Sequence, residues 1–199
     1  VEDEKLAAER LQTILKEYDK DAEVVACLES IEETVQYFKL HAHPDLLLLD
    51  ITPLSLGLET MGGLMDVLLP RNSKIPARAA RQYTTYKDGQ SGMKIAVYQG
   101  ERDMVTDNRK LAEFNLSGIP AMPAGMPKVE VSFLINADGI LVVKAKELRS
   151  GIEQTIEVNP QYELTDEAVE KMLLDSIKNA EKDIATRALV EAKTEGEQL

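Results

Sequence analysis

Residues 128–158 read KVEVSFLINADGILVVKAKELRSGIEQTIEV, and this stretch decides the fold class. Apolar and polar residues alternate over 128–133, the period of a strand with one buried and one wet face. The sequence Asn136-Ala137-Asp138-Gly139 is typical of a turn, because glycine adopts positive φ without steric cost. Further strands are predicted over 140–146 and, after Ser150-Gly151, over 152–158. Short strands joined by tight turns indicate an antiparallel sheet.

The same rhythm of short strands and turn residues extends back to residue 51. Residues 93–99 are predicted to form an earlier strand, which Gly100 closes. The segment 119–127 holds too many prolines for a central strand and is expected to be a loop. We therefore expect residues 51–160 to form an antiparallel β-sandwich.

Residues 161–199 follow a helical period instead. Thr165 is a good N-cap, and the acids Asp166 and Glu167 favour the positive end of a helix dipole. Apolar residues then recur at helical spacing up to about Lys193: Val169, Met172, Leu173, Ile177, Ala180, Ile184 and Leu189. The sandwich is therefore expected to be followed by one long amphipathic helix.

Residues 1–50 have a third pattern. Helices are predicted over 4–18 and 31–41, the second capped by Ser30, and strands over 23–27 and 46–49. Alternating strands and helices begin a doubly wound α/β sheet. The fold class is therefore mainly β, preceded by a partial α/β segment whose residues 45–50 form a linker-like strand.

Composition excludes several classes of function. A net charge of −12 over 199 residues argues against nucleic acid or an anionic membrane as partner. The single cysteine, Cys27, allows no internal disulfide and no cysteine zinc site, which favours the reducing cytoplasm. No signal peptide or membrane-spanning run is recognised. His41 and His43 lack further ligands at metal-binding spacing, so we expect a surface pair and no metal site.

From residue 46 onward the chain resembles the interdomain linker and peptide-binding domain of Hsp70 chaperones. The matching blocks follow the family's order without gaps and comprise residues 52–63, 71–72, 75–76, 88–91, 99–102, 114–116, 118–119, 125–127 and 137–141. Tyr86 and residues 118–125 are more similar to the branch that serves iron–sulfur cluster assembly, HscA, than to the general chaperone DnaK.

The resemblance implies a channel for an extended apolar peptide. Its central pocket would be lined by Leu58, Leu64, Met93, Ile95 and Val129. Thr60, Tyr83 and Thr84 would border the channel and meet the peptide backbone, and Met61 and Tyr86 would form an arch over it. Residues 161–199 would be a truncated α-helical lid. Leu64 and Ile95 are equally compatible with an ordinary sandwich core.

The function implied is that of a chaperone substrate-binding domain. Its partners would be apolar segments of unfolded clients or an iron–sulfur scaffold protein, with a J-domain co-chaperone acting on an intact family member. No nucleotide-binding domain or Gly-rich phosphate loop is recognised, so we expect no enzyme activity and no ATP or other cofactor in this chain. A structural β-module without a ligand is an alternative.

Residues 1–50 resemble the N-terminal half of a response-regulator receiver domain, which predicts a chimera joined near residues 45–51. Asp50 matches the phospho-accepting aspartate, and Glu2 and Asp3 match acids that hold Mg²⁺. The receiver family's later Ser/Thr and Lys positions and its remaining strands are missing. Phosphotransfer at Asp50 is an alternative function. Because those receiver elements are missing, the three acids are expected to be solvated or structural.

Overall fold

The computed structural model describes residues 12–17, 19–28, 31–41, 51–161 and 164–196. The chain divides into two compact units, Val1–Asp50 and Ile51–Leu199. The first unit holds helical residues 12–17 and helix α2, Ile31–Leu40, which confirms the helix predicted over 31–41.

The strand predicted over 23–27 is wrong, because residues 22–28 are neither helix nor strand. A strand needs a neighbour for its backbone hydrogen bonds, and the described part of this unit offers none. The strand predicted over 46–49 lies outside the described residues, as does most of the helix predicted over 4–18.

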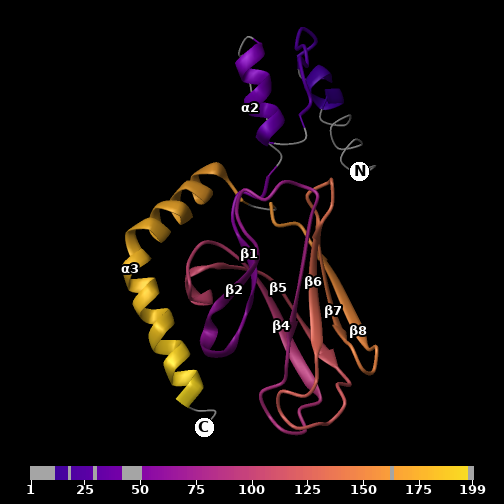
Figure 1. Cartoon of the computed structure of the whole chain (residues 1–199), viewed down its shortest axis with the longest axis vertical. Coiled ribbons are helices and arrows are strands. Elements are labelled where there is room, and N and C mark those ends of the chain that lie inside the picture. The colour runs from indigo at the N-terminus through magenta and orange to yellow at the C-terminus, as the bar shows by residue number, and fades with distance from the viewer. Residues whose placement is uncertain (1–11, 18, 29–30, 42–50, 162–163, 197–199) are drawn as a thin grey trace. The chain divides into compact units, whose positions relative to one another are not determined.

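The second unit contains two antiparallel sheets of four strands each, followed by one long helix (Figure 1). One sheet has the order β2-β1-β4-β5, with β1 Leu56–Glu59, β2 Met65–Leu69, β4 Gly92–Gln99 and β5 Arg109–Ser117. The other has the order β3-β6-β7-β8, with β3 Ala77–Tyr83, β6 Val129–Ile135, β7 Leu141–Glu147 and β8 Glu153–Val158. Short 3-10 helices η1, Met61–Gly63, and η2, Val105–Asp107, lie in the connections. The chain is mainly β, as predicted.

The hairpin of β6 and β7 follows directly from the quoted stretch. Val129 pairs with Glu147 and Ile135 with Leu141 in an unbroken register. Between the strands, the side chain of Asn136 accepts hydrogen bonds from the amides of Asp138 and Ile140, both at 3.0 Å. Gly139 has a φ of 74°, the positive value for which glycine is favoured. The proline-rich segment 119–127 contains no strand, which confirms the predicted loop.

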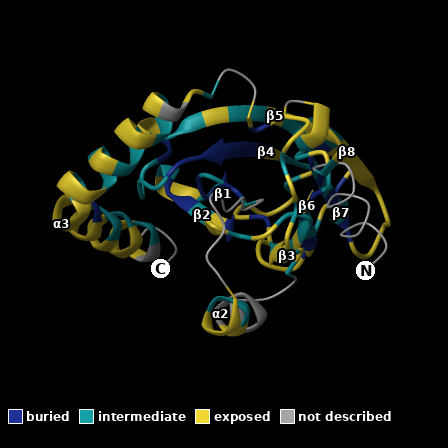
Figure 2. Cartoon of the chain, turned by 90° about the horizontal axis from the view of Figure 1, so that it is seen from above, coloured by how far each residue is buried: buried dark blue, intermediate teal, exposed yellow. Residues whose placement is uncertain are grey.

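The core lies where the inner faces of the two sheets meet. Every second residue of β6 is at most 1% exposed, from Val129 to Ile135, and Phe133 is the largest of them. Leu56, Ile95 and other buried residues of the first sheet belong to the same cluster. In the view from above, the buried segments gather between the sheets and exposed residues line their outer sides (Figure 2). The period-two pattern thus places one face of each inner strand in the core.

Helix α3, Asp166–Gly196, runs slightly beyond the predicted end near Lys193. The hydroxyl of Thr165 accepts a hydrogen bond from the amide of Ala168 at 3.3 Å, the predicted N-cap contact.

A second buried cluster lies beside the main core and consists of Met65, Ala96, Tyr98 and Val105. Among the described residues, no helix has both the length and the hydropathy needed to cross a membrane.

Glu147, at the end of β7, is a fully buried carboxylate that holds the next turn. It accepts hydrogen bonds from the amides of Arg149 at 3.1 Å and Ser150 at 2.5 Å, and from the Ser150 hydroxyl at 2.6 Å. Burial alone would raise the pKa of Glu147, but these hydrogen bonds outweigh it, so the net pKa is lowered.

We expect Glu147→Gln to lower the free energy of unfolding at neutral pH by about 1–3 kcal/mol, the cost of weakening hydrogen bonds to a buried charge. A pKa lowered by folding adds stability that is present above the unfolded value of about 4.3 and is lost as pH falls through the folded value. The difference between the two proteins should therefore shrink in acid. Urea unfolding between pH 7 and pH 3 measures this, and a constant difference at all pH values would contradict it.

Candidate functional site

The connection between β1 and β2 is a tight, exposed turn. Both the amide and the hydroxyl of Thr60 donate to the carbonyl oxygen of Leu64, at 2.8 Å and 3.1 Å. Gly62 and Gly63 between them have φ values of 78° and 74°, which glycine adopts without strain. A Cβ added to Gly62 would lie 2.2 Å from Cγ1 of Val190 on α3. Met61 is therefore 40% exposed on this turn, and Val190 of α3 packs closely against Gly62.

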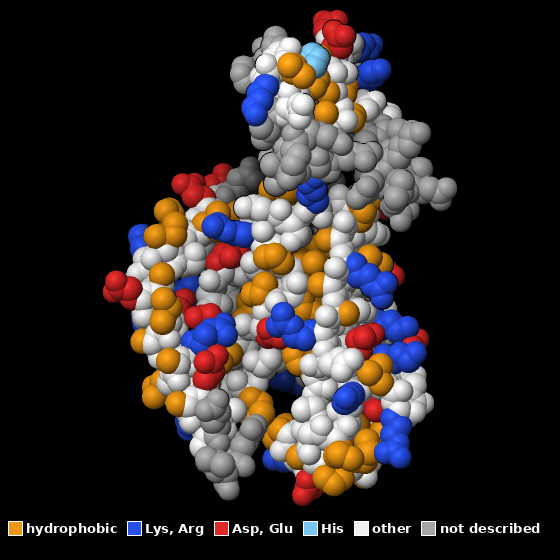
Figure 3. Space-filling view, in the orientation of Figure 1, with side chains coloured by type: hydrophobic (Ala, Val, Ile, Leu, Met, Phe, Trp, Pro, Cys, Tyr) orange, Lys and Arg blue, Asp and Glu red, His pale blue; other side chains and the backbone are white. Residues whose placement is uncertain are grey.

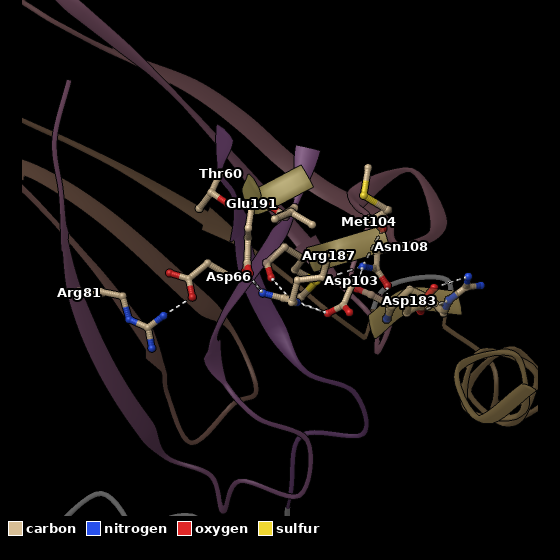
Figure 4. Close-up of polar contacts among 12 residues, drawn as sticks. Thr60, Asp66, Arg81, Asp103, Met104, Asn108, Asp183, Arg187 and Glu191 are labelled. Carbon is tan, nitrogen blue, oxygen red and sulfur yellow. Dashed lines mark hydrogen bonds and ion pairs between the residues drawn. The ribbon is translucent and has the colours of Figure 1, made fainter. Parts of the chain in front are cut away.

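Two ion pairs fasten α3 to the turn at residues 100–103 that follows β4. Arg102 donates to both carboxylate oxygens of Asp183, at 2.6 Å and 2.9 Å, and the two side chains are only 12% and 10% exposed. Arg187 donates from Nε to Asp103 at 2.9 Å and from Nη2 to the carbonyl oxygen of Met65 at 3.3 Å. The hydrogen bond from Arg102 lowers the pKa of Asp183, against the opposing effect of burial. We name these two pairs, Arg102–Asp183 and Arg187–Asp103, the α3 clamp; the second of them is labelled in Figure 4.

A cavity of about 340 Å³ lies between the β1–β2 connection and α3. Its walls are Thr60, Met61, Leu64, Met65 and Asp66 on one side and Arg187, Glu191 and Thr194 on the other. Figure 4 shows Asp66 facing Arg81. The cavity is thus apolar near Met61 and Leu64, and it carries charged groups on both sides, Asp66 on β2 and Arg187 and Glu191 on α3.

Asp66 is held on its other side by β3. It accepts a hydrogen bond from the hydroxyl of Tyr83 at 2.7 Å and forms an ion pair with Arg81. Burial is the largest effect on Tyr83 and raises its pKa, and the hydrogen bond to Asp66 adds to the rise. Tyr83 is therefore a neutral donor that fixes the carboxylate rather than a titrating group.

The predicted site residues fall into three places. Thr60, Met61 and Leu64 line the cavity together. Leu58, Ile95 and Val129 are buried in the main core, with Met93 and Tyr83 half-buried against it. Thr84 and Tyr86 lie in the connection between β3 and β4, where Tyr86 is 54% exposed.

The β3–β4 connection is braced by the proline-rich loop. The Thr84 hydroxyl donates to the carbonyl oxygen of Pro127 at 2.7 Å. The amide of Gly125 donates to the carbonyl oxygen of Thr85 at 2.9 Å. The carboxylate of Asp88 accepts a hydrogen bond from the amide of Ala124 at 2.7 Å. Tyr86 is therefore carried by a loop with defined backbone contacts.

Sequence reasoning missed the α3 side of the cavity and the clamp. Neither Arg187, Glu191 nor Thr194 was predicted as a site residue, because a helix period shows which residues share a face but not what that face meets. One signal was present. The adjacent charges of Arg102 and Asp103 are complemented by the opposite charges of Asp183 and Arg187, which are one helical turn apart.

Metal ligation finds no support among the described residues, where no cluster of three His, Cys, Asp or Glu side chains has the arrangement to hold an ion. His41 stacks on Tyr37 of its own helix with ring centroids 4.2 Å apart. The receiver acids Glu2, Asp3 and Asp50 lie outside the described residues, as does His43.

Comparison with known proteins shows one consistent relationship. The family model described as "Hsp70 protein" matches residues 13–199. Similar curated proteins include the "Chaperone protein HscA homolog" of Herminiimonas arsenicoxydans, 47% identical, and that of Pseudomonas putida, 50% identical, each over 94% of this chain. The homolog of Pseudomonas aeruginosa strain LESB58 is 55% identical over 78% of it. The chain spans only 25–30% of the length of these relatives.

The receiver interpretation of the N-terminal segment is unsupported. The Hsp70 family model begins at residue 13, well inside the segment assigned to a receiver. The relatives cover 94% of the chain, so their similarity also runs through most of residues 1–50. A run of leucines between two aspartates was too short and too common a pattern to identify a second family.

The predictions of no enzyme activity and no ATP cofactor are wrong. Both rested on the failure to recognise a nucleotide-binding domain in this sequence. The family match places the chain among the Hsp70 proteins, which are ATPases, so ATP binding and ATPase activity are consistent with the protein. A chain that spans 30% of its relatives' length gives no ground for excluding them. The match over residues 13–199 and the identity to these relatives agree, and the chain belongs to the Hsp70 family.

Proposed function

We propose that residues 51–196 hold an extended apolar peptide segment of a client protein, with α3 as a lid. The observation that carries this proposal is the cavity between the β1–β2 connection and α3, which brings together Thr60, Met61 and Leu64. Concave, largely apolar sites with a few polar groups are the usual form of a ligand site.

The channel would pass between two exposed turns. Met61 and Tyr86 are 40% and 54% exposed, on the β1–β2 and β3–β4 connections respectively. In the space-filling view, the surface is hollowed between the β1–β2 turn and the loops at the lower end of the unit (Figure 3).

Beneath these turns, the main core would supply the floor of the channel. Met93 is half-buried against the cluster that contains Leu58, Ile95 and Val129. An extended peptide gains affinity from backbone hydrogen bonds and specificity from pockets for alternate side chains. Thioether side chains at Met61 and Met93 suit a pocket that accepts different apolar residues, because methionine is flexible and polarizable.

The client would be an unfolded chain or an iron–sulfur scaffold protein. The relatives named above are called HscA homologs, the branch to which Tyr86 and residues 118–125 are similar. A J-domain co-chaperone would be the further partner of the whole protein, in the cytoplasm. With a net charge of −12, nucleic acid and anionic membranes are poor partners.

Peptide binding is tested by fluorescence anisotropy of a labelled Leu/Pro/Val-rich peptide titrated with this protein. We expect saturable binding, and we expect Met93→Trp to weaken it about tenfold, since overfilling a packed pocket costs about 1–3 kcal/mol. Met126→Trp is the matched control, because Met126 is 60% exposed and lies outside the predicted pocket.

Absence of saturable binding by the folded wild-type protein would remove the proposal and favour the structural β-module. Equal effects of the two tryptophan substitutions would place the peptide elsewhere on the surface. Circular dichroism of all three proteins establishes that they are folded.

A further inference from the structure

Three loops meet at one end of the second unit and hold one another in place. They are the β3–β4 connection, residues 84–91, the β5–β6 connection, residues 118–128, and the β7–β8 turn, residues 148–152. The amide of Gly89 donates to the carbonyl oxygen of Met122 at 2.9 Å, and the Arg149 guanidinium donates to the sulfur of Met122 at 3.0 Å. The amide of Leu148 donates to the carbonyl oxygen of Lys128 at 2.9 Å. The three loops therefore form one surface.

This surface exposes apolar side chains from two of the loops. Met126 is 60% exposed, Leu148 43% and Ile152 38%. Ile152 packs over Gly118, where an added Cβ would lie 2.9 Å from its Cδ1, so the β7–β8 turn covers the start of the β5–β6 connection. Single exposed apolar residues are normal, whereas apolar residues that lie together within a polar rim are typical of interaction sites. In the space-filling view, hydrophobic side chains gather at the lower end of the unit with Lys or Arg side chains beside them (Figure 3).

The polar rim of this surface is basic. Lys87, Lys128 and Arg149 are all exposed, and none of them forms an ion pair with a carboxylate of the part of the chain that the structure describes. The carboxylate of Glu147 beneath the turn is fully buried, and that of Asp88 accepts a hydrogen bond from a backbone amide at 2.7 Å. In a chain with a net charge of −12, this end of the unit thus presents an excess of positive charge.

We propose that this surface binds a partner segment in which apolar residues are flanked by aspartate or glutamate. We name it the loop platform, and it consists of Lys87, Met126, Lys128, Leu148, Arg149 and Ile152. The partner's apolar side chains would cover those of the platform, and its carboxylates would pair with the three cations. Complementary charge steers the encounter and selects among partners. Since hydrogen bonds already join the loops, binding would cost little further ordering.

The composition of the platform favours this occupant over a polyanion. A nucleic acid would use the cations and leave the apolar side chains in water. The platform shares no residue with the cavity beneath α3 or with the predicted peptide channel. The inference therefore does not rest on the proposed function, and a partner could occupy the platform while a peptide occupies the channel.

The test uses a labelled synthetic peptide of leucine and isoleucine flanked by glutamates. Its fluorescence anisotropy is measured with the wild-type protein at low ionic strength, with an excess of the unlabelled Leu/Pro/Val-rich peptide to fill the proposed channel. We expect saturable binding that weakens as salt is added, because the cations of the platform are exposed. The same peptide with lysines in place of its glutamates, and one with serines in place of its apolar residues, should each bind about tenfold more weakly.

Substitutions in the platform test the same contacts from the protein side. Lys87→Glu/Lys128→Glu reverses two of its charges, and Leu148→Ser removes one of its apolar side chains. We expect each variant to raise the dissociation constant of the glutamate-flanked peptide about tenfold at low ionic strength, and the effect of the charge reversal should shrink as salt is added.

Exposed positions on α3 provide the matched controls. Lys171→Glu/Lys178→Glu makes the same change of net charge, and Leu174→Ser removes a leucine that is 47% exposed. Both should leave binding unchanged. Controls as damaging as the platform variants, displacement of the probe by the unlabelled peptide, or absence of saturable binding would overturn the inference. Equal binding of any two of the three peptides would overturn it as well, and that comparison needs only the wild-type protein. Circular dichroism establishes that each variant is folded.

Discussion

Asp183→Ala is expected to release α3 from the sheet and to shorten the lifetime of a bound peptide. Asp183 and Arg102 are 10% and 12% exposed and share two hydrogen bonds, so removal of the carboxylate leaves a mostly buried guanidinium without its main acceptor. Breaking a buried pair by removing one partner costs about 3–5 kcal/mol. Hydrogen exchange of the α3 amides and peptide dissociation kinetics measure the two consequences.

Glu181→Ala is the matched control for this prediction. Glu181 is exposed on the same helix, and alanine has a similarly high helix propensity, so the change removes a carboxylate without touching the clamp. Equal exchange rates in the two variants would contradict the assigned role of Asp183. Because folding lowers the pKa of Asp183, the clamp should hold at neutral pH and weaken only as pH falls through that lowered value.

Phe133→Ala is expected to have the largest effect on stability. Phe133 is fully buried where the two sheets meet, and it is the largest fully buried side chain of the described residues. Truncation of a buried phenylalanine costs about 3–5 kcal/mol, from lost transfer free energy and the cavity left behind. That is a large part of the total stability of about 5–15 kcal/mol typical of a native protein. Denaturant unfolding followed by circular dichroism measures the loss.

The neighbouring residue provides the control. Leu134 points to the other face of β6 and is 43% exposed, so Leu134→Ala should cost about 1 kcal/mol or less. A similar loss in both variants would mean that the predicted inner and outer faces of β6 are not distinguished in solution.

The strands were predictable to the extent that their side chains alternate. Over 128–158 the period of two, the turn Asn136–Gly139 and the turn at Ser150-Gly151 were sufficient to place β6, β7 and β8 within about two residues. The segment 23–27 is also apolar, yet it forms no strand. Local propensity cannot supply a pairing partner, which is why that prediction failed.

The site was predictable only in part, and through resemblance rather than pattern. Met61 was predicted to close a channel, and the structure places it with Thr60 and Leu64 around one cavity. The hydrogen bonds between Thr60 and Leu64 are local in sequence, with Gly62 and Gly63 setting the turn. The binding roles of these residues, and of Tyr86 on the opposite loop, remain predictions for the peptide titration to decide.

The sequence by itself determined the mainly β class, the inner face of each alternating strand and the start of α3 at its Thr165 cap, because each depends on neighbours within a few positions. Only the tertiary structure decided what α3 covers. Arg102 and Asp183 are 81 positions apart, and Asp103 and Arg187 are 84 apart. Each charge alone is compatible with a solvated surface. The cavity and its clamp exist only because folding brings the β1–β2 connection, the turn at 100–103 and the helix to one place.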